Sequence, residues 1–255
     1  MGNTLPLRIV LDEAGTPGAG TELFLTAGFA VRGPVVEICN SWKRLSCEQG
    51  FPSKATRFNY QQFLALVQFI FENELWPIAA SHAMDSKLAD QLKTRNNDFP
   101  NHRTERSLAS LTHAHSVWSK QVFMTISQCL VSIIQHRGPI DRLDVAVDKF
   151  SLTEEMKEFV EATFKSYFVP GGVFTQWVAE RIDRYSEEPV LRQLLKGVSA
   201  GYKVGPDALS LDLNSKGPLS QIADAVAALF RKSRLGDKDA MEPCQVLCDA
   251  FSDRS

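Results

Sequence analysis

The sequence predicts an α/β domain in which helices flank a mixed β-sheet. Strand-like and helix-like segments alternate along most of the chain, which is the pattern of that fold class. Of the 255 residues, 44% are hydrophobic and 23% are charged, ordinary proportions for a globular protein. No stretch rich in serine, glycine and proline divides the chain, so we expect one elaborated domain over residues 1–255.

The first part of the chain predicts two strands followed by two helices. Residues 7–12 (LRIVLD) and 22–31 (ELFLTAGFAV) are apolar runs typical of strands, and a glycine- and proline-rich loop joins them as a long hairpin. Residues 34–48 place apolar side chains loosely at helical spacing. Residues 59–74 repeat apolar side chains at every third and fourth position, with Asn59 placed to cap this second helix.

The rest of the chain alternates between strands and helices. Residues 142–148 alternate strictly, with apolar residues on one face and Asp144 and Asp148 on the other. Pro218 lies in the first turn of a helix predicted over 218–232, where proline costs no hydrogen bond. Further strands are predicted at residues 76–84, 171–180 and 208–214, and further helices at 107–136, 152–168, 187–200 and 239–252.

Charge and targeting signals argue against several protein classes. The net charge of −2 gives no overall basic surface, so any phosphate-binding surface must be local. No basic segment leads into an apolar stretch at the start, and no apolar run reaches about 18 residues, so we expect no signal peptide and no membrane span. The five cysteines are scattered, as is typical of reduced cytoplasmic thiols. Cys244 and Cys248 lack a second pair of ligands, so we expect no zinc site there.

Acidic residues stand at the ends of two predicted strands and on a late helix. Asp12 and Glu13 end the first strand, Asp148 ends the strand at 142–148, and Asp224 lies on the helix after the last strand. Ligands of open α/β sheets gather beyond the carboxyl ends of the strands, so Asp12 and Asp148 meet there if their strands are parallel neighbours. Alanines around Asp224 let its helix lie close to the sheet, which would bring this carboxylate within reach of the strand ends.

Clustered carboxylates predict a divalent cation. Like charges repel, and Mg²⁺ or Mn²⁺ offsets that repulsion while taking oxygen ligands. Two such ions about 3.5–4 Å apart can activate water and stabilise the leaving oxygen of a phosphodiester. The alternative is a structural role, because an aspartate at a strand end often caps the following turn and a helix aspartate is often simply solvated.

Four stretches carry a resemblance to a known family: "LDEAGTPG" at 11–18, "FLTAGFAV" at 24–31, "VAVDK" at 145–149 and "LNSKGPLSQIADAVA" at 213–227. Together they resemble the bacterial and phage domain-of-unknown-function 3800 family, which opens with a DESG-like motif and closes with an SK…LQxAD-like motif. The resemblance implies a ribonuclease H-like fold with a helical insertion at about 86–138.

The same resemblance implies the roles of individual residues. Asp12, Asp148 and Asp224 match the acidic positions expected to bind metal, with Glu13 beside them. The chain departs from the family pattern in having Ala14 in place of serine and Asn214 in place of aspartate. Ribonuclease H-like enzymes usually also place a glutamate on the first long helix, and Glu48 and Glu72 are the nearby candidates.

These observations predict a divalent-metal-dependent phosphodiesterase that cleaves DNA or RNA, in the setting of anti-phage defence or a mobile element. Asp12, Asp148 and Asp224 would hold Mg²⁺ or Mn²⁺, and Glu13 would assist them. Lys149 and Lys216, each in or beside a matched motif, would neutralise phosphate. The alternative is an inactive ribonuclease H-like scaffold or a binding subunit of a larger defence complex, which the unassigned glutamate and the mild net charge favour. A nucleotide sensor is a third reading, but the chain has no glycine-rich phosphate loop.

Overall fold

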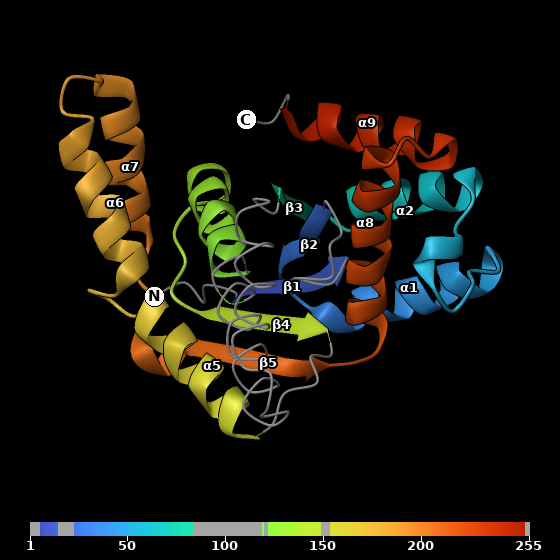
Figure 1. Ribbon diagram of the computed structural model, residues 1–255, viewed down its shortest axis with the longest axis horizontal. Helices are drawn as coiled ribbons and strands as arrows, with labels where there is room; N and C mark the ends of the chain where they lie inside the picture. Colours follow the sequence, from blue (N-terminus) through green and yellow to red (C-terminus); the bar gives the residue numbers. More distant parts are fainter. Residues whose placement is uncertain (1–5, 15–22, 84–118, 120–121, 149–153, 253–255) are drawn as a thin grey trace, which may run out of the picture.

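A computed structural model describes residues 6–14, 23–83, 119, 122–148 and 154–252. These residues form one five-stranded sheet with helices on both faces (Figure 1). The predicted α/β class, with a mixed sheet flanked by helices, is therefore confirmed. Among the described helices, none has the length and hydrophobicity needed to cross a bilayer.

The sheet has the strand order β3-β2-β1-β4-β5. Strand β2 is antiparallel to both β1 and β3, whereas β1, β4 and β5 are parallel. The antiparallel hairpin therefore joins a parallel half of the sheet at β1. The strands are Leu7–Ala14 (β1), Leu23–Arg32 (β2), Trp76–Ala83 (β3), Leu143–Asp148 (β4) and Leu209–Ser215 (β5).

Each face of the sheet has its own hydrophobic core, because alternate side chains of a strand point to opposite faces. Leu11 of β1 belongs to one core and its neighbour Val10 to the other. The Leu11 face is covered by a helix over 122–137, α5 (Glu154–Phe168), α6 (Val173–Arg184) and α7 (Pro189–Gly201). The Val10 face is covered by α1 (Val35–Glu48), α2 (Tyr60–Glu72), α8 (Pro218–Arg234) and α9 (Lys238–Ser252).

Local capping signals in the sequence are realised in the structure. The Asn59 side chain accepts a hydrogen bond from the Gln62 backbone N–H at 3.0 Å, and the Gln62 side chain accepts one from the Asn59 N–H at 3.1 Å. This reciprocal pair satisfies two donors at the start of α2. Helix α8 begins at Pro218, after Gly217 turns the chain with a φ of 99°. The predicted cap at Asn59 and the predicted helix start at Pro218 are therefore confirmed.

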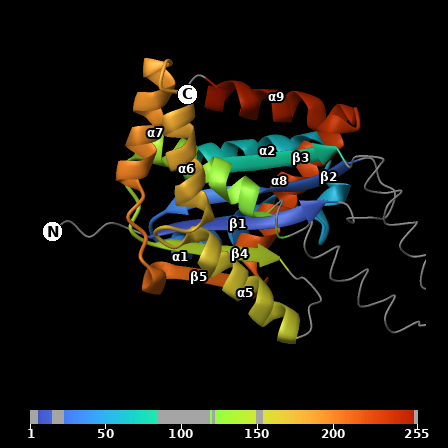
Figure 2. The ribbon, with the colours of Figure 1, turned by 60° about the vertical axis from the view of Figure 1, so that its left-hand side comes forward.

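The strand predicted at residues 171–180 is wrong. This segment forms the start of helix α6, which pairs with α7 at one end of the molecule (Figures 1 and 2). Phe174 and Val178 lie four residues apart and are both buried, which is the spacing of a helix face. The valine, phenylalanine, threonine and tryptophan in this stretch favour a strand by propensity, and tertiary packing overrides that preference.

The predicted insertion at about 86–138 is described only in part. Its last part contains the helix over 122–137, which has no label in Figure 1, and residues 84–118 lie outside the described residues. This helix overlaps the end of the helix predicted at 107–136. The single-domain organisation over 1–255 stays a prediction.

Candidate functional site

The carboxyl ends of the three parallel strands lie at one edge of the sheet. Leu11 of β1 is level with Val147 of β4, so residues 12 and 148 follow at the same level on neighbouring strands. On the other side of β4, Asp148 is paired with Ser215 of β5. In Figure 1 the arrows of β4 and β5 point the same way. The sequence places Asp12 and Asp148 at one edge only if their strands are parallel neighbours. Strands β1 and β4 are parallel neighbours, so this condition is met.

The predicted acids on the strands are described to different extents. Asp12 is half-buried within β1 and faces Ala27 of β2 across the antiparallel pairing. For Glu13 and Asp148 the backbone is described, and their side chains lie outside the described part of the chain. Lys149 also lies outside the described residues. The strand register thus places the backbones of residues 12 and 148 side by side, one position beyond the pair Leu11 and Val147.

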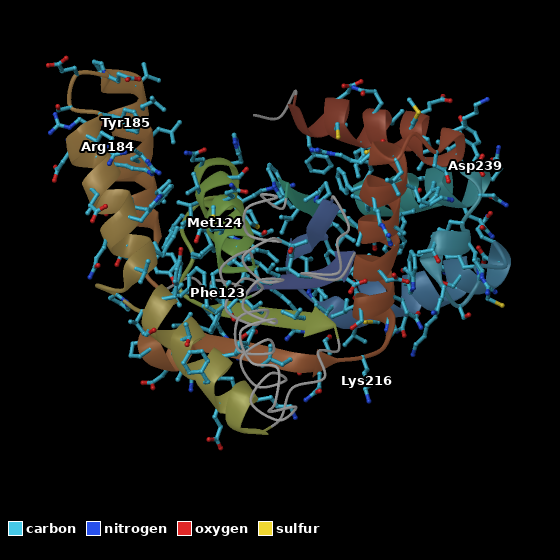
Figure 3. All side chains as sticks on the ribbon, in the orientation of Figure 1. Phe123, Met124, Arg184, Tyr185, Lys216 and Asp239 are labelled. Atoms are coloured by element: carbon cyan, nitrogen blue, oxygen red, sulfur yellow. The ribbon has the colours of Figure 1, made fainter. Side chains whose placement is uncertain are left out.

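Helix α8 is fastened to the same edge by two buried serines. The Ser220 hydroxyl in its first turn donates a hydrogen bond to the Ser215 hydroxyl at the end of β5, at 3.0 Å. Between them Lys216 is exposed beside the carboxyl end of β5 (Figure 3). Helix α8 then packs against β1 and β2, and its buried alanines permit this close contact. The chain thereby carries Asp224 from the strand end onto the face of the sheet.

Asp224 is half-buried, and its carboxylate is tied to a neighbouring turn. Its Oδ2 accepts a hydrogen bond at 3.2 Å from the backbone N–H of Ala55, the first residue of the short 3-10 helix η1 (Ala55–Arg57). A neutral amide satisfies part of the hydrogen-bonding capacity of the carboxylate but carries no positive charge to pair with it. Among the described residues no lysine or arginine forms an ion pair with Asp224.

Within the described part of the chain, no group of three or more His, Cys, Asp and Glu side chains is arranged to hold a metal. The side chains of Glu13 and Asp148 do not belong to that part. The structure therefore places the backbones of Asp12 and Asp148 at one edge, and it places Asp224 in the second turn of the helix that starts from that edge.

The two candidates for a helix glutamate lie elsewhere. Glu72 lines a cavity together with Leu7, the first residue of β1, which places it at the amino edge of the strand. Its carboxylate accepts a hydrogen bond from the Gln68 side chain at 2.6 Å. Glu48 is exposed and lines a cavity between α1 and α2. Neither residue is brought to the edge that carries Asp12 and Asp148.

A small cavity of about 170 Å³ lies beside Asp224, and sequence reasoning missed it. Aromatic side chains line part of it, and the Gln221 amide and the Asp224 carboxylate line another part. The aromatic residues are Trp42 from α1 and Phe51 and Phe58 from the segment between α1 and α2. Two phenylalanines flanking the polar "PSKATR" stretch are the signal that could have found it.

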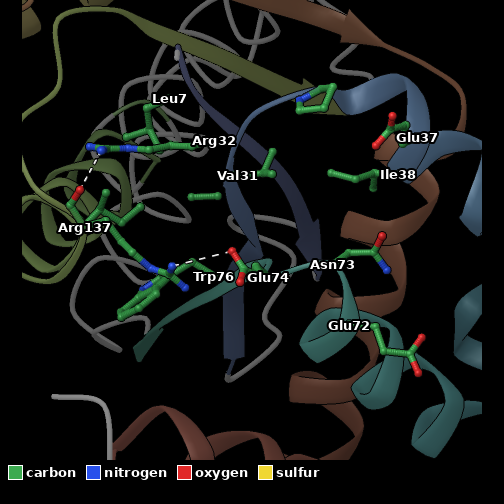
Figure 4. Close-up of a pocket in the computed structure, with 13 residues that line it drawn as sticks. Leu7, Val31, Arg32, Glu37, Ile38, Glu72, Asn73, Glu74, Trp76 and Arg137 are labelled. Carbon is green, nitrogen blue, oxygen red and sulfur yellow. Dashed lines mark hydrogen bonds and ion pairs between the residues drawn. The ribbon is translucent and has the colours of Figure 1, made fainter. Parts of the chain in front are cut away.

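A larger cavity of about 440 Å³ opens at the amino edge of the sheet (Figure 4). Arg32, Glu74, Trp76 and Arg137 contribute polar and aromatic atoms to its wall. The guanidinium of Arg137 lies 5.9 Å from the centre of the Trp76 ring and forms a 3.8 Å ion pair with Glu74. The positive charge of Arg137 is therefore already paired with Trp76 and Glu74 in the wall of the cavity.

Arg32 uses its guanidinium to close the end of a helix. It donates hydrogen bonds to the carbonyl oxygens of Arg137, the last residue of the helix over 122–137, and of Gly138 and Pro139, at 2.7, 2.8 and 3.0 Å. Burial lowers the pKa of Arg32, the positive charge of Arg137 lowers it further, and Asp141 opposes both effects. The arginine therefore has a clear structural role: it caps a helix that would otherwise leave carbonyl groups unsatisfied.

Comparisons with known proteins add no assignment to this geometry. No protein-family model matches the chain, and no match is found among curated proteins. The resemblance to the domain-of-unknown-function 3800 family therefore stays a prediction drawn from the motifs quoted above.

Proposed function

We propose that this protein is a ribonuclease H-like phosphodiesterase that uses Mg²⁺ or Mn²⁺ to cleave DNA or RNA. The observation that carries the proposal is the parallel register of β1, β4 and β5, which brings residues 12, 148 and 215 to one edge. Helix α8, with Asp224, starts from that edge. The mixed sheet supports the ribonuclease H-like fold that the quoted motifs imply, and an anti-phage or mobile-element setting follows from those motifs alone.

The residues at this edge fit a hard divalent cation. Asp12, Asp148 and Asp224 offer carboxylate oxygens, which are the ligands that Mg²⁺ and Mn²⁺ prefer. Asp224 is half-buried with no ion-pair partner in the described part of the chain, so its charge favours a cation nearby. These three aspartates would hold the metal, and Glu13 would assist them.

Chemistry at this edge would divide between the metal and the chain. A bound divalent ion supplies an activated water and stabilises the charge that develops on the phosphate. The chain itself would bind and orient the substrate. Lys216 is exposed at the carboxyl end of β5, and Lys149 directly follows Asp148, so both would neutralise the phosphate backbone. The N–H groups at the start of α8 favour an anion in the same place.

The test is Mn²⁺-dependent cleavage of labelled single- and double-stranded DNA and RNA by the wild type and three variants. Asp12→Asn and Asp224→Asn should each lower the cleavage rate by roughly 100-fold or more, since even residues behind metal ligands cost 10- to 100-fold. Asp239→Asn, at an exposed position at the start of α9, is the matched control and should cleave like the wild type. Cleavage that survives both site substitutions rejects the assignment.

One contact favours the alternative of an inactive scaffold or binding subunit. The hydrogen bond from the Ala55 N–H to Asp224 is a structural use of this carboxylate. An asparagine keeps an oxygen acceptor for that N–H, whereas an alanine does not. If Asp224→Asn is silent, Asp224→Ala lowers the free energy of unfolding by about 1 kcal/mol, and no variant or wild type cleaves, the residue is only a cap and the scaffold reading holds.

A further inference from the structure

The small cavity beside Asp224 has the size of a single ring system. Its volume of about 170 Å³ lies below the roughly 300–1,000 Å³ of sites for drug-sized molecules. Ser53 and Gln221 line it and are exposed, so the cavity is accessible from solvent. A whole nucleotide would exceed it, whereas a flat heterocycle with its sugar and phosphate outside fits this description.

The aromatic side of the cavity is closely packed. Trp42 and Phe58 are buried, and the half-buried Phe51 lies between them with ring centroids at 5.3 Å from Trp42 and 4.5 Å from Phe58. Trp42 also makes an edge contact with Phe69 at 5.1 Å. Trp42 and Phe58 hold the Phe51 ring in place, so a flat ligand that stacks on Phe51 orders no flexible side chain. Stacking on such rings is tolerant of base identity, because every nucleobase has a π-face.

On the polar side of the cavity, Gln221 offers a donor and Asp224 offers an acceptor. The Trp42 indole N–H donates to Gln221 Oε1 at 3.2 Å, and since indole is only a donor, the amide NH₂ of Gln221 remains to donate to a ligand. Asp224 accepts the Ala55 N–H on Oδ2, and because a carboxylate has about four acceptor sites it can accept from a base and still bind the metal. A donor and an acceptor close together match the Watson–Crick edge of an unpaired base.

Cations lie on the segment that forms the aromatic side. Lys54 and Arg57 are exposed on either side of Ala55, and Lys216 is exposed near the start of α8. They would attract the phosphates that flank a base held in the cavity, although the protein as a whole carries a net charge of −2.

We propose that this cavity receives one unpaired nucleobase of a single-stranded nucleic acid, next to the edge where the phosphodiester is cut. This inference rests on the proposed function and narrows it, because a paired base cannot present its Watson–Crick edge to Gln221 and Asp224. The substrate class is therefore single-stranded DNA or RNA, or an unpaired position within a duplex, where the cost of extruding the base is smallest.

The test measures binding separately from cleavage. The full-length protein is titrated in Ca²⁺ with a fluorescently labelled single strand, and with strands in which one abasic position is moved along the sequence. Omitting the base at the bound position should weaken binding about 10-fold, within the range that stacking supplies, and omissions elsewhere should have little effect. A 2-aminopurine moved along the same strand should be quenched at that position only.

Two substitutions and two matched controls tie the effect to the cavity. Phe51→Leu and Gln221→Ala should weaken binding of the intact strand several-fold without weakening binding of the abasic strand. Phe159→Leu, at an exposed position on α5, and Gln245→Ala, on α9, should leave both strands unaffected. A thermal melt of each variant shows whether it is folded. Weaker binding by a variant with an unchanged melting temperature is then due to the cavity.

The outcomes separate this inference from the function on which it rests. If the protein cleaves single strands, but no abasic position and neither cavity variant changes binding, the base pocket is overturned and the phosphodiesterase stands. A duplex bound as tightly as its single strands overturns the pocket in the same way. If the protein neither binds nor cleaves any strand, with or without Mn²⁺, both proposals fail.

Discussion

At the scale of single residues, Arg32 shows how one side chain can stabilise a distant helix. Its guanidinium joins the end of β2 to three successive carbonyl groups at the end of the helix over 122–137. We expect Arg32→Met to lower the free energy of unfolding by about 1–2 kcal/mol, since three carbonyl groups lose a charged donor and the bond to Gly138 is partly buried. Arg184→Met, at an exposed position on α6, should change it by less than about 0.5 kcal/mol. Urea denaturation of both variants measures the difference, and equal values would contradict the capping role.

At the scale of secondary-structure elements, two glycines behave in opposite ways. A Cβ on Gly28 of β2 would overlap the carbonyl oxygen of Val10 and come within 2.9 Å of the Leu11 Cα in β1. Gly28→Ala should therefore lower the free energy of unfolding by about 3 kcal/mol or more, and it should disturb β1 next to Asp12. A Cβ on Gly197 of α7 would have no atom within 4 Å. Gly197→Ala should therefore raise the free energy of unfolding by about 0.5–1 kcal/mol. Chemical denaturation measures both changes in the free energy of unfolding. A small loss of stability for Gly28→Ala would contradict the close approach of β1 and β2.

At the scale of the whole molecule, two thiols report on the two faces of the sheet. Cys129 is buried in the helix over 122–137 on one face, where burial raises its pKa, and Cys244 is buried in α9 on the other. In a protein with the other three cysteines changed to serine, a maleimide should label both thiols over the same range of urea, because we expect one cooperative domain. The exposed Cys47 of the wild type, labelled without urea, is the control for the reagent. Separate transitions would show two independently unfolding units.

The part of the fold that local patterns encode could be predicted. Strict alternation identified β4, and the spacing of apolar residues with a capping asparagine identified α2. The strand-end aspartates pointed to one edge, and the register of β1 with β4 has the parallel arrangement that this required. The stretch at the start of α6 was misread, because its residue types favour a strand and only burial on one side decides for a helix.

Contacts between distant segments could not be predicted in the same way. The bond between Ala55 and Asp224 joins a loop after α1 to a helix near the end of the chain, and neither segment carries a local signal for the other. The cavity beside Asp224 depends on this meeting and on the packing of Phe51 against Trp42. A single sequence records which carboxylates are available, whereas their neighbours are decided by how the layers pack.

The central position of β1 also determines when, during synthesis, the sheet around it can be completed. Its antiparallel neighbour β2 follows directly in the chain, whereas β4, its parallel neighbour, and helix α8 emerge from the ribosome much later. The strand that bears Asp12 can therefore pair only with β2 until most of the polypeptide has been synthesised. A nascent or truncated chain lacks the companions of that aspartate, so any activity at this edge belongs only to molecules whose translation has reached the last helices.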